Sequence, residues 1–222
     1  MAINQLFNKI APSYDRLNHI LSFGMDYSWR NVLARSLKPC EKVLDVAIGT
    51  GDLSWAILKK KRAKQITGVD ISTEMLAIGK QKFPDAPIDW LEVSVLDMPF
   101  ADNSFDAVVC AYGVRNFSDL NKGLQEMYRV LKPNGQLRIL EFAMPQNKLV
   151  RGVYSLYFSR LMPLVGGWLS GDKQAYEYLF ESVNRFLTPE QMQETLQHIG
   201  FENVTYKPLT AGVTTLYYAT KN

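Results

Sequence analysis

The sequence predicts an α/β fold in which one mostly parallel, seven-stranded sheet carries helices on both faces and ends in an antiparallel hairpin. From about residue 43 to residue 142, strand and helix patterns alternate, which is typical of a parallel sheet. The first strand runs into a glycine turn and then into a helix. After residue 200, a short loop joins two strand patterns, so these strands must pair in antiparallel fashion.

Each element has a local signal in the sequence. Apolar runs predict the parallel strands, at residues 43–46, 65–70, 88–93, 105–111 and 137–142. Between them we expect one helix after the glycine turn, one capped by Ser72, and one that opens at Ser118 and stops at the turn 132–135. A last helix begins at Thr188 and closes at Gly200. The hairpin strands are expected at 201–206 and 213–219.

Composition favours one soluble enzyme domain. The 222 residues are 47% hydrophobic, which suits a single packed core, and the net charge is only +3. Basic residues cluster only at 59–64, where a solvated helix end is favoured over a lipid headgroup contact, so no nucleic-acid partner is predicted. Cys40 and Cys110 lack metal-ligand spacing, and no metal site is expected. Neither a leader nor a membrane span is recognised, so we expect a cytoplasmic protein.

The single domain, residues 1–222, is expected to have distinct parts with distinct tasks. Residues 1–38 form an N-terminal helical cap, and residues 43–142 form a cofactor-binding core. Residues 148–184 are long for a crossover, so part of this insertion is expected to cover the substrate. Residues 201–220 form the terminal hairpin.

The glycine turn after the first strand carries the clearest chemical signal. Gly49 and Gly51 let the backbone approach a ligand closely, and the next helix directs free N–H groups toward it. A dinucleotide would place its pyrophosphate between Asp45 and Asp52, which would repel it. S-adenosylmethionine instead brings an ammonium and a sulfonium, which these acids attract. Together with the terminal hairpin, this charge pattern predicts a Rossmann-like S-adenosylmethionine methyltransferase fold.

Further cofactor residues are expected where the next strands end, because ligands bind beyond the carboxyl ends of parallel strands. Asp70 follows the second strand, about 20 residues past the turn, where an acid accepts hydrogen bonds from ribose hydroxyls. A bland alternative is that Asp70 only caps the following helix. After the third strand, Ser94 and Val95 offer a side-chain acceptor and a backbone N–H to adenine.

Several motifs together resemble the quinone-biosynthesis C-methyltransferases of the demethylmenaquinone and ubiquinone pathways. The resemblance covers nearly the whole chain, and its Arg-Asn pair and Tyr-Leu-Phe-Glu-Ser block are specific to that family. The motifs lie at residues 7–18, 112–116, 127–135, 140–142, 171–172, 176–182 and 209–213.

The resemblance implies an S-adenosylmethionine-dependent enzyme with cofactor contacts at Thr50, Asp70, the Ser94 and Val95 pair, and Ala111. The chain departs from the family pattern at Ile48, where many relatives have a small residue. Ser94 stands where Asn or Asp is usual, and Ala111 replaces a frequent serine, so only the backbone of Ala111 could bind.

Chemistry suggests how such an enzyme would work. A ring carbon attacks a methyl group best when a neighbouring hydroxyl ionises, so the substrate should be a prenylated quinol rather than the quinone. Arg115 can lower the pKa of that hydroxyl and hold a water that removes the proton, while Asn116 orients the water. Tyr14 is a third candidate, through a hydrogen bond to a ring oxygen. The alternatives are a salt bridge from Arg115 to Glu141 or another acid at the edge of the sheet, and simple helix packing for Tyr14.

Residues 148–184 are strongly apolar and aromatic, which favours a lid or a channel for the prenyl tail. Val150, Val153, Tyr157 and Leu161 recur at helical spacing beside Tyr154 and Phe158. A membrane-surface helix is less favoured, because Arg151 and Arg160 lie on opposite helix faces, but peripheral contact with the membrane stays open. An exposed aromatic lid would also favour a homodimer. His19 and His198 are expected to be surface or packing residues.

Other classes are weighed against this prediction. A nicotinamide-dependent oxidoreductase would leave the terminal hairpin unexplained, and a nucleic-acid methyltransferase should carry a concentrated basic surface. A silent cofactor-binding partner stays open. The sequence does not separate a naphthoquinol from a benzoquinol substrate, and we expect demethylmenaquinol first.

Overall fold

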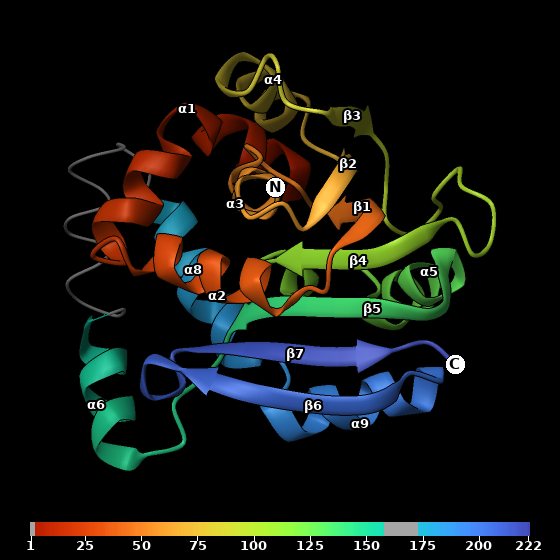
Figure 1. Ribbon diagram of the computed structural model, residues 1–222. Helices are drawn as coiled ribbons and strands as arrows, with labels where there is room; N and C mark the ends of the chain where they lie inside the picture. Colours follow the sequence, from red (N-terminus) through yellow and green to blue (C-terminus); the bar gives the residue numbers. More distant parts are fainter. Residues whose placement is uncertain (1–2, 158–172) are drawn as a thin grey trace.

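The computed structural model describes residues 3–157 and 173–222. Its centre is a seven-stranded sheet of order β3-β2-β1-β4-β5-β7-β6 (Figure 1). Strands β1 to β5 pair in parallel, and β7 lies antiparallel between β5 and β6, which confirms the predicted sheet. The strands are β1 Cys40–Val46, β2 Ala63–Asp70, β3 Ile88–Glu92, β4 Phe105–Ala111, β5 Leu131–Phe142, β6 Glu202–Leu209 and β7 Thr214–Thr220.

Helices connect and cover these strands. The α-helices are α1 Ile3–Leu21, α2 Met25–Ser36, α3 Asp52–Lys59, α4 Thr73–Lys82, α5 Leu120–Val130, α6 Lys148–Leu156, α8 Lys173–Arg185 and α9 Pro189–Ile199. Two short 3₁₀ turns are η1 Val114–Asn116 and η3 Thr210–Gly212.

Helices cover both faces of the sheet because strand residues alternate between them. Val108 packs in one apolar cluster with residues of α5 and α9. Its neighbour Val109 packs in a second cluster with residues of α2 and α3. Central strands are therefore buried on both sides, which explains their continuous apolar runs.

The helix starts follow the capping chemistry of their sequences. Ser72 accepts a hydrogen bond from the backbone N–H of Met75 at the start of α4, as predicted. Thr188 forms a reciprocal capping box at the start of α9. The cap of α5 is Asp119, one residue later than the predicted Ser118, because its carboxylate accepts from the N–H of Lys122.

Strand β5 begins at Leu131, earlier than the predicted residue 137. Leu131 pairs with Phe105, but Gln136 pairs with Ala107, so extra residues bulge out of β5 between these pairs. The turn signal at 132–135 therefore marks an irregular stretch inside a strand, because β5 pairs with β4 both before and after it.

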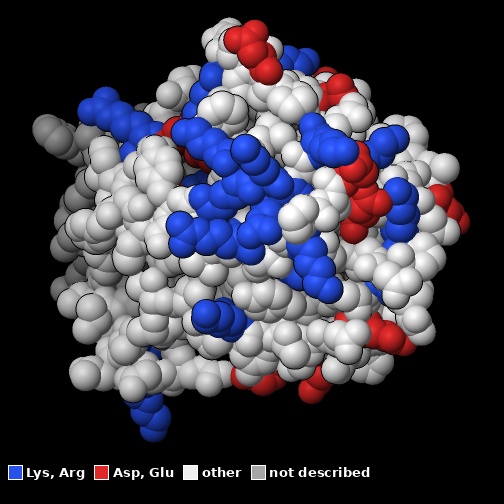
Figure 2. Space-filling model, in the orientation of Figure 1, with Lys and Arg blue, Asp and Glu red and all other residues white. Residues whose placement is uncertain are grey.

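Helices α1, α6 and α8 lie on the side of the sheet toward which the β4 arrow points in Figure 1. The carboxyl ends of the parallel strands therefore face these helices. Figure 2 shows lysine and arginine side chains gathered on one face, with acidic side chains among them. In the described parts of the chain, no helix is both long and apolar enough to cross a membrane.

Two glycines should respond in opposite ways to alanine. In α4, a Cβ on Gly79 would lie 2.4 Å from the Trp90 ring, whereas a Cβ on Gly152 in α6 would meet nothing within 4 Å. We expect Gly79→Ala to lower the free energy of unfolding by about 1 to 3 kcal/mol through overpacking. Gly152→Ala should raise it by up to about 1 kcal/mol, through helix propensity. Urea denaturation measures both, and an unchanged or more stable Gly79→Ala protein would contradict the packing.

Candidate active site

The backbone of the loop between β1 and α3 takes a path that favours glycine. Ala47, Gly49 and Gly51 all have positive φ angles, of 55°, 57° and 86°. A Cβ on Gly49 would meet nothing within 4 Å, so this turn borders open space. Ile48 points away from that space, because its side chain is buried against Gly68 of β2. The large residue at position 48 therefore leaves the turn accessible.

Asp70 joins the end of β2 to this loop. Its carboxylate accepts from the backbone N–H of Gly49 and from that of Ser72, each at 2.9 Å. Burial raises the pKa of Asp70, and these N–H groups act against the shift. The side chain that caps α4 is that of Ser72, so Ser72 rather than Asp70 has the helix-capping role that was the alternative for Asp70.

A small cavity of about 120 Å³ lies beyond the carboxyl ends of β1, β2, β3 and β4. Its lining includes these predicted cofactor residues: Gly49, Asp70, Ser94, Val95 and Ala111. Asn116, predicted for catalysis, also lines it. The arrangement is suited to a nucleoside, since an acid, backbone groups and apolar side chains face one space.

The remaining predicted cofactor residues lie behind this cavity rather than in its wall. The carboxylate of Asp45 is buried beneath the loop and accepts from the hydroxyl of Ser54 at 2.6 Å. Thr50 donates its hydroxyl to Asp15 of α1 at 2.6 Å. Gly51 is the N-cap of α3, and a Cβ there would lie 2.5 Å from Trp90. These residues shape the loop from outside the cavity.

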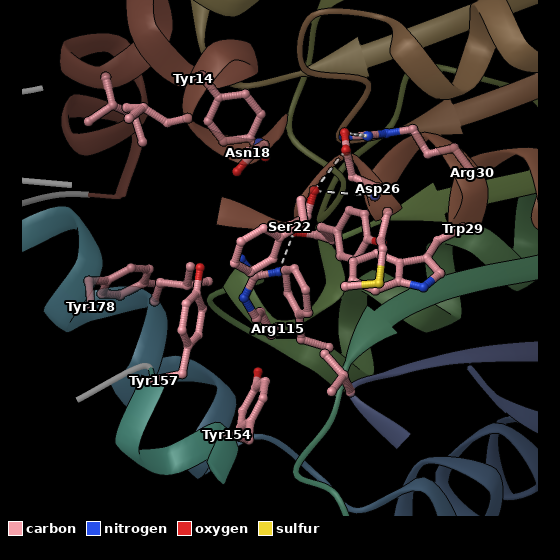
Figure 3. A pocket seen from close by; sticks show the side chains of 18 of the residues that line it. Tyr14, Asn18, Ser22, Asp26, Trp29, Arg30, Arg115, Tyr154, Tyr157 and Tyr178 are labelled. Atoms are coloured by element: carbon pink, nitrogen blue, oxygen red, sulfur yellow. Dashed lines mark hydrogen bonds and ion pairs between the residues drawn. The ribbon is translucent and has the colours of Figure 1, made fainter. Parts of the chain in front are cut away.

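A larger cavity of about 520 Å³ lies next to the small one and is mostly apolar. Its walls come from α1, α2, α6 and α8, with polar side chains on part of the lining (Figure 3). Phe7, Tyr14 and Tyr112 line both cavities. The two cavities therefore adjoin at these residues, and ligands in them would be neighbours.

Arg115 combines the two roles that the sequence left open. It lies in η1 just after β4, and its Nη1 is 2.7 Å from Oε1 of the fully buried Glu141. The salt-bridge alternative is therefore present, yet Arg115 also lines the larger cavity. The same Nη1 donates to the carbonyl of Tyr112, whose backbone has a φ of 60°. This pair and turn hold the guanidinium at the cavity wall.

Tyr14 and Asn116 occupy the region beside Arg115. Burial raises the pKa of Tyr14, while the charges of Arg115 and Arg30 act in the opposite direction. The phenol is therefore a protonated donor near neutral pH. Asn116 donates to the carbonyl of Tyr112 and accepts from the hydroxyl of Tyr178 in α8. Its side chain thus lies between η1 and α8.

Sequence reasoning missed the contacts that fasten α1 to the core. Asp15 accepts from Thr50 and pairs with Lys82 at 2.6 Å, and Lys82 also pairs with Asp52. Asn8 accepts from the hydroxyl of Ser72 at 2.6 Å. No local pattern signals these contacts, because their partners are 30 or more residues apart.

Sequence reasoning also missed a polar group at the wall of the larger cavity. Asp26 pairs with Arg30 and with His19, both at 2.6 Å, and His19 stacks on Tyr27. His19, expected to be a surface or packing residue, is half-buried in this group. His198 lies on α9, next to the carbonyl of Glu194.

The glycine turn after β1, the acid that ends β2 and the antiparallel β7 define the class of S-adenosylmethionine-dependent methyltransferase folds. A possible histamine N-methyltransferase from Thermotoga maritima matches with a TM-score of 0.72 and 18% identity, covering 98% of this chain and 99% of that one. The [4+2]-cyclase SpnF matches with a TM-score of 0.73 and 18% identity, covering 99% and 95%. Because a cyclase shares it, this fold alone does not fix the reaction.

The chain belongs to the ubiE/COQ5 methyltransferase family, whose model matches residues 1–221. A "Ubiquinone/menaquinone biosynthesis C-methyltransferase UbiE" from Geotalea daltonii is 42% identical, over 99% of this chain and 96% of the relative. A "Demethylmenaquinone methyltransferase" from Bacteroides fragilis is 40% identical, over 99% and 92%. The predicted family is thereby confirmed, and S-adenosylmethionine is its expected cofactor.

Asp45 should make stability fall as the pH rises. Burial raises the pKa of Asp45 to about 7, against an opposing effect of the Ser54 hydroxyl. An unfolded Asp titrates near about 3.9, so between these values the folded state binds more protons, and the free energy of unfolding decreases with pH. Asp45→Asn should shrink the loss between pH 5 and 7.5 by on the order of 2 kcal/mol.

Urea denaturation at both pH values measures this difference. Part of the slope should persist in Asp45→Asn, because burial also raises the pKa of Asp70 and Glu141. Asp85→Asn, at an exposed position before β3, is the matched control and should keep the wild-type slope. An Asp45→Asn protein with the wild-type slope would show that Asp45 is ionised in the folded state.

Proposed function

We propose that the protein methylates a ring carbon of a reduced prenylated naphthoquinol, demethylmenaquinol, with S-adenosylmethionine as the methyl donor. The observation that carries this proposal is the shared wall of the two cavities, formed by Phe7, Tyr14 and Tyr112. A small, partly polar cavity suits the cofactor, and a large apolar cavity suits a ring with a prenyl tail. The names of the relatives, which refer to menaquinone and ubiquinone biosynthesis and to demethylmenaquinone, support a quinol substrate. The alternative substrate is a benzoquinol of the ubiquinone pathway, which the Geotalea name also includes.

The residues around the small cavity fit S-adenosylmethionine. The open space at Gly49 admits a ligand against the backbone, and Asp70 offers an acceptor for ribose hydroxyls. Ser94, Val95 and Ala111 are proposed to surround the adenine. When bound, the cofactor supplies an electrophilic methyl group on a sulfonium.

The residues of the larger cavity are proposed to prepare the quinol for attack. Arg115 places a positive charge at the cavity wall, which lowers the pKa of a nearby ring hydroxyl and favours the nucleophilic phenolate. Tyr14 donates a hydrogen bond to a ring oxygen at the shared wall. Asn116 lines the small cavity beside Arg115 and orients a water that takes up the proton. Holding the ring and the methyl donor next to each other in adjoining cavities also lowers the entropic part of the barrier.

The parts of the chain have proposed tasks as well. Within residues 1–38, α1 lines both cavities and α2 lines the larger one, while the strand ends within 43–142 hold the cofactor. In the insertion 148–184, Val150, Val153, Tyr154 and Tyr157 line the larger cavity, as a lid or channel requires. Leu161 and Phe158 lie outside the described residues. A homodimer and the lack of a nucleic-acid partner stay predictions.

The rim of the larger cavity is proposed to touch the membrane that contains the substrate. Phe23, Leu149 and Val153 line this cavity and are nonetheless 77%, 79% and 65% exposed. Leu149, Val153 and Leu156 share one face of α6 by their spacing. An exposed apolar rim around an apolar cavity would let a prenyl tail pass from lipid to protein with little contact with water. With this rim, the protein is proposed to act as a peripheral protein at the inner face of the membrane.

The function is tested by methyl transfer from labelled S-adenosylmethionine in a pair of variants. Arg115→Ala would leave Glu141 buried without a partner, so we instead compare Glu141→Gln with the double variant Arg115→Gln, Glu141→Gln. Glu141→Gln keeps the cationic side chain. The double variant should lose about 100-fold in kcat relative to Glu141→Gln, because it removes a charge that stabilises the developing phenolate. Cofactor binding by calorimetry should be equal in both.

Reduced demethylmenaquinol, a reduced demethylated ubiquinone precursor and both oxidised quinones serve as acceptors. Product from the naphthoquinol supports the proposal, and product from the benzoquinol alone supports the alternative. No transfer to either quinol, with the cofactor bound, would refute quinol methylation. Equal kcat in the two variants would refute the role of Arg115.

Membrane contact is tested by flotation with vesicles of zwitterionic and anionic phospholipids. The triple variant Phe23→Ser, Leu149→Ser, Val153→Ser should reduce the vesicle-bound fraction several-fold, because it removes apolar side chains from the rim. Leu91→Ser is the matched control, since Leu91 is 37% exposed on β3 and lies outside the cavity lining. Equal binding by the triple variant and the control would contradict the proposed rim.

A further inference from the structure

Asp26 is a carboxylate in the wall of the larger cavity, where apolar side chains prevail. It lies in the first turn of α2, and its side chain is only 4% exposed. Among the described residues that line this cavity, it is the sole Asp or Glu. Ser22 and Arg30 line the cavity beside it, as Figure 3 shows. A buried charge of this kind is costly unless it has partners, so its position needs an explanation.

The surroundings of Asp26 keep it ionised and oriented. One carboxylate oxygen lies 2.6 Å from Nη1 of Arg30 and 2.6 Å from Nδ1 of His19. The other accepts from the hydroxyl of Ser22 at 2.8 Å. Burial raises the pKa of Asp26, but the charge of Arg30 and the Ser22 hydroxyl outweigh it, so the pKa lies below its ordinary value. Asp26 is therefore a pure hydrogen-bond acceptor near neutral pH.

Asp26 keeps capacity for one further donor. A carboxylate has about four acceptor positions, and Arg30, His19 and Ser22 occupy three of them. The remaining position is on the oxygen that accepts from Ser22. Tyr27 lies farther out, where its hydroxyl contacts Nε2 of His19 at 2.7 Å, and it is 52% exposed. The hydrogen bonds of Asp26, His19 and Tyr27 thus extend from the cavity to the surface, and none of them uses the fourth acceptor position of Asp26.

The cavity therefore contains two kinds of polar group. Tyr14 and Arg115 can donate, as can Arg30, which donates to Asp26, whereas Asp26 only accepts. A quinol carries two hydroxyls on opposite sides of the ring, and each can donate a hydrogen bond. A quinone carries carbonyl oxygens, which only accept. A carbonyl facing Asp26 would leave the fourth acceptor position of the desolvated carboxylate unfilled and place two electron-rich oxygens together.

Resting on the proposed function, we infer that Asp26 accepts a hydrogen bond from one ring hydroxyl and thereby selects the reduced quinol over the oxidised quinone. The other ring oxygen faces Tyr14 and Arg115. Sites built to hydrogen-bond a hydroxyl reject analogues that lack it by as much as about 10⁴-fold. Selection in the binding step also keeps the oxidised quinone, which has no hydroxyl to ionise, from occupying the site.

The test compares the affinities of a short-tailed 2-prenyl-1,4-naphthoquinone and its quinol, measured anaerobically with S-adenosylhomocysteine bound. We expect the wild-type protein to bind the quinol at least about 100-fold more tightly, a conservative part of the range above. Asp26→Asn should lower this ratio at least about 10-fold, because an amide N–H can donate to a carbonyl oxygen. Tyr27→Phe is the matched control in the same network and should keep the wild-type ratio.

Asp26→Asn leaves Arg30 without its carboxylate, and Arg30 is only 7% exposed. If that variant does not fold, the double variant Asp26→Asn, Arg30→Gln removes both charges together and should show the same fall in the ratio. An unchanged ratio in a folded variant overturns the inference, even where wild-type protein methylates the quinol. Failure of the wild-type protein to bind either ring would instead refute the proposed function.

Discussion

The attachment of α1 to the carboxyl edge of the sheet is the constraint on which both cavities depend. Phe7 and Tyr14 of this helix line both cavities, so they form the wall only while α1 stays in place. Asp15 holds it through the hydroxyl of Thr50 in the glycine loop and through Lys82. Single partly exposed ion pairs contribute little, but Asp15 joins a hydrogen bond and an ion pair in one network. The loop next to the cofactor and the wall next to the substrate are therefore mechanically joined.

Each charged side chain that lines the larger cavity has an oppositely charged partner. Arg115 pairs with Glu141, and Arg30 pairs with Asp26. Burying such pairs costs more desolvation energy than apolar side chains of similar size would. Keeping two ion pairs at an apolar cavity therefore lowers the folding stability of the protein, and we infer that the pairs are kept because they act on the substrate. One pair presents a cation to the ring and the other presents an acceptor, which suits a substrate with two hydroxyl groups.

Local patterns in the sequence predicted most of the fold. The β-branched runs, the glycine turn and the cap at Ser72 act within a few residues, so the parallel strands and α4 could be placed without the structure. Asp70 was found because strand ends converge at one edge. The start of β5 was not, because its pairing with β4 across a bulge overrides the turn signal at 132–135.

Contacts between distant elements explain what the sequence did not reveal of the site. Asp15 and Thr50 are 35 residues apart, and only the packing of α1 brings them together. His19 and Asp26 are separated by seven residues across the turn between α1 and α2, a geometry that helical periodicity does not describe. The pair of Arg115 and Glu141 was among the alternatives that the sequence offered. Arg115 comes just after β4, and Glu141 lies near the end of the neighbouring β5, so both are at the same edge of the sheet.

The central claim is that a methyl group passes directly between the two cavities where they adjoin, beside Phe7, Tyr14 and Tyr112. A crystal structure with S-adenosylhomocysteine and a reduced demethylmenaquinol analogue tests it most directly. The account predicts the homocysteine sulfur in the small cavity beside these residues, and the ring in the larger cavity with a ring carbon facing that sulfur. A ring bound outside the larger cavity, or a sulfur directed away from Tyr14, would contradict it.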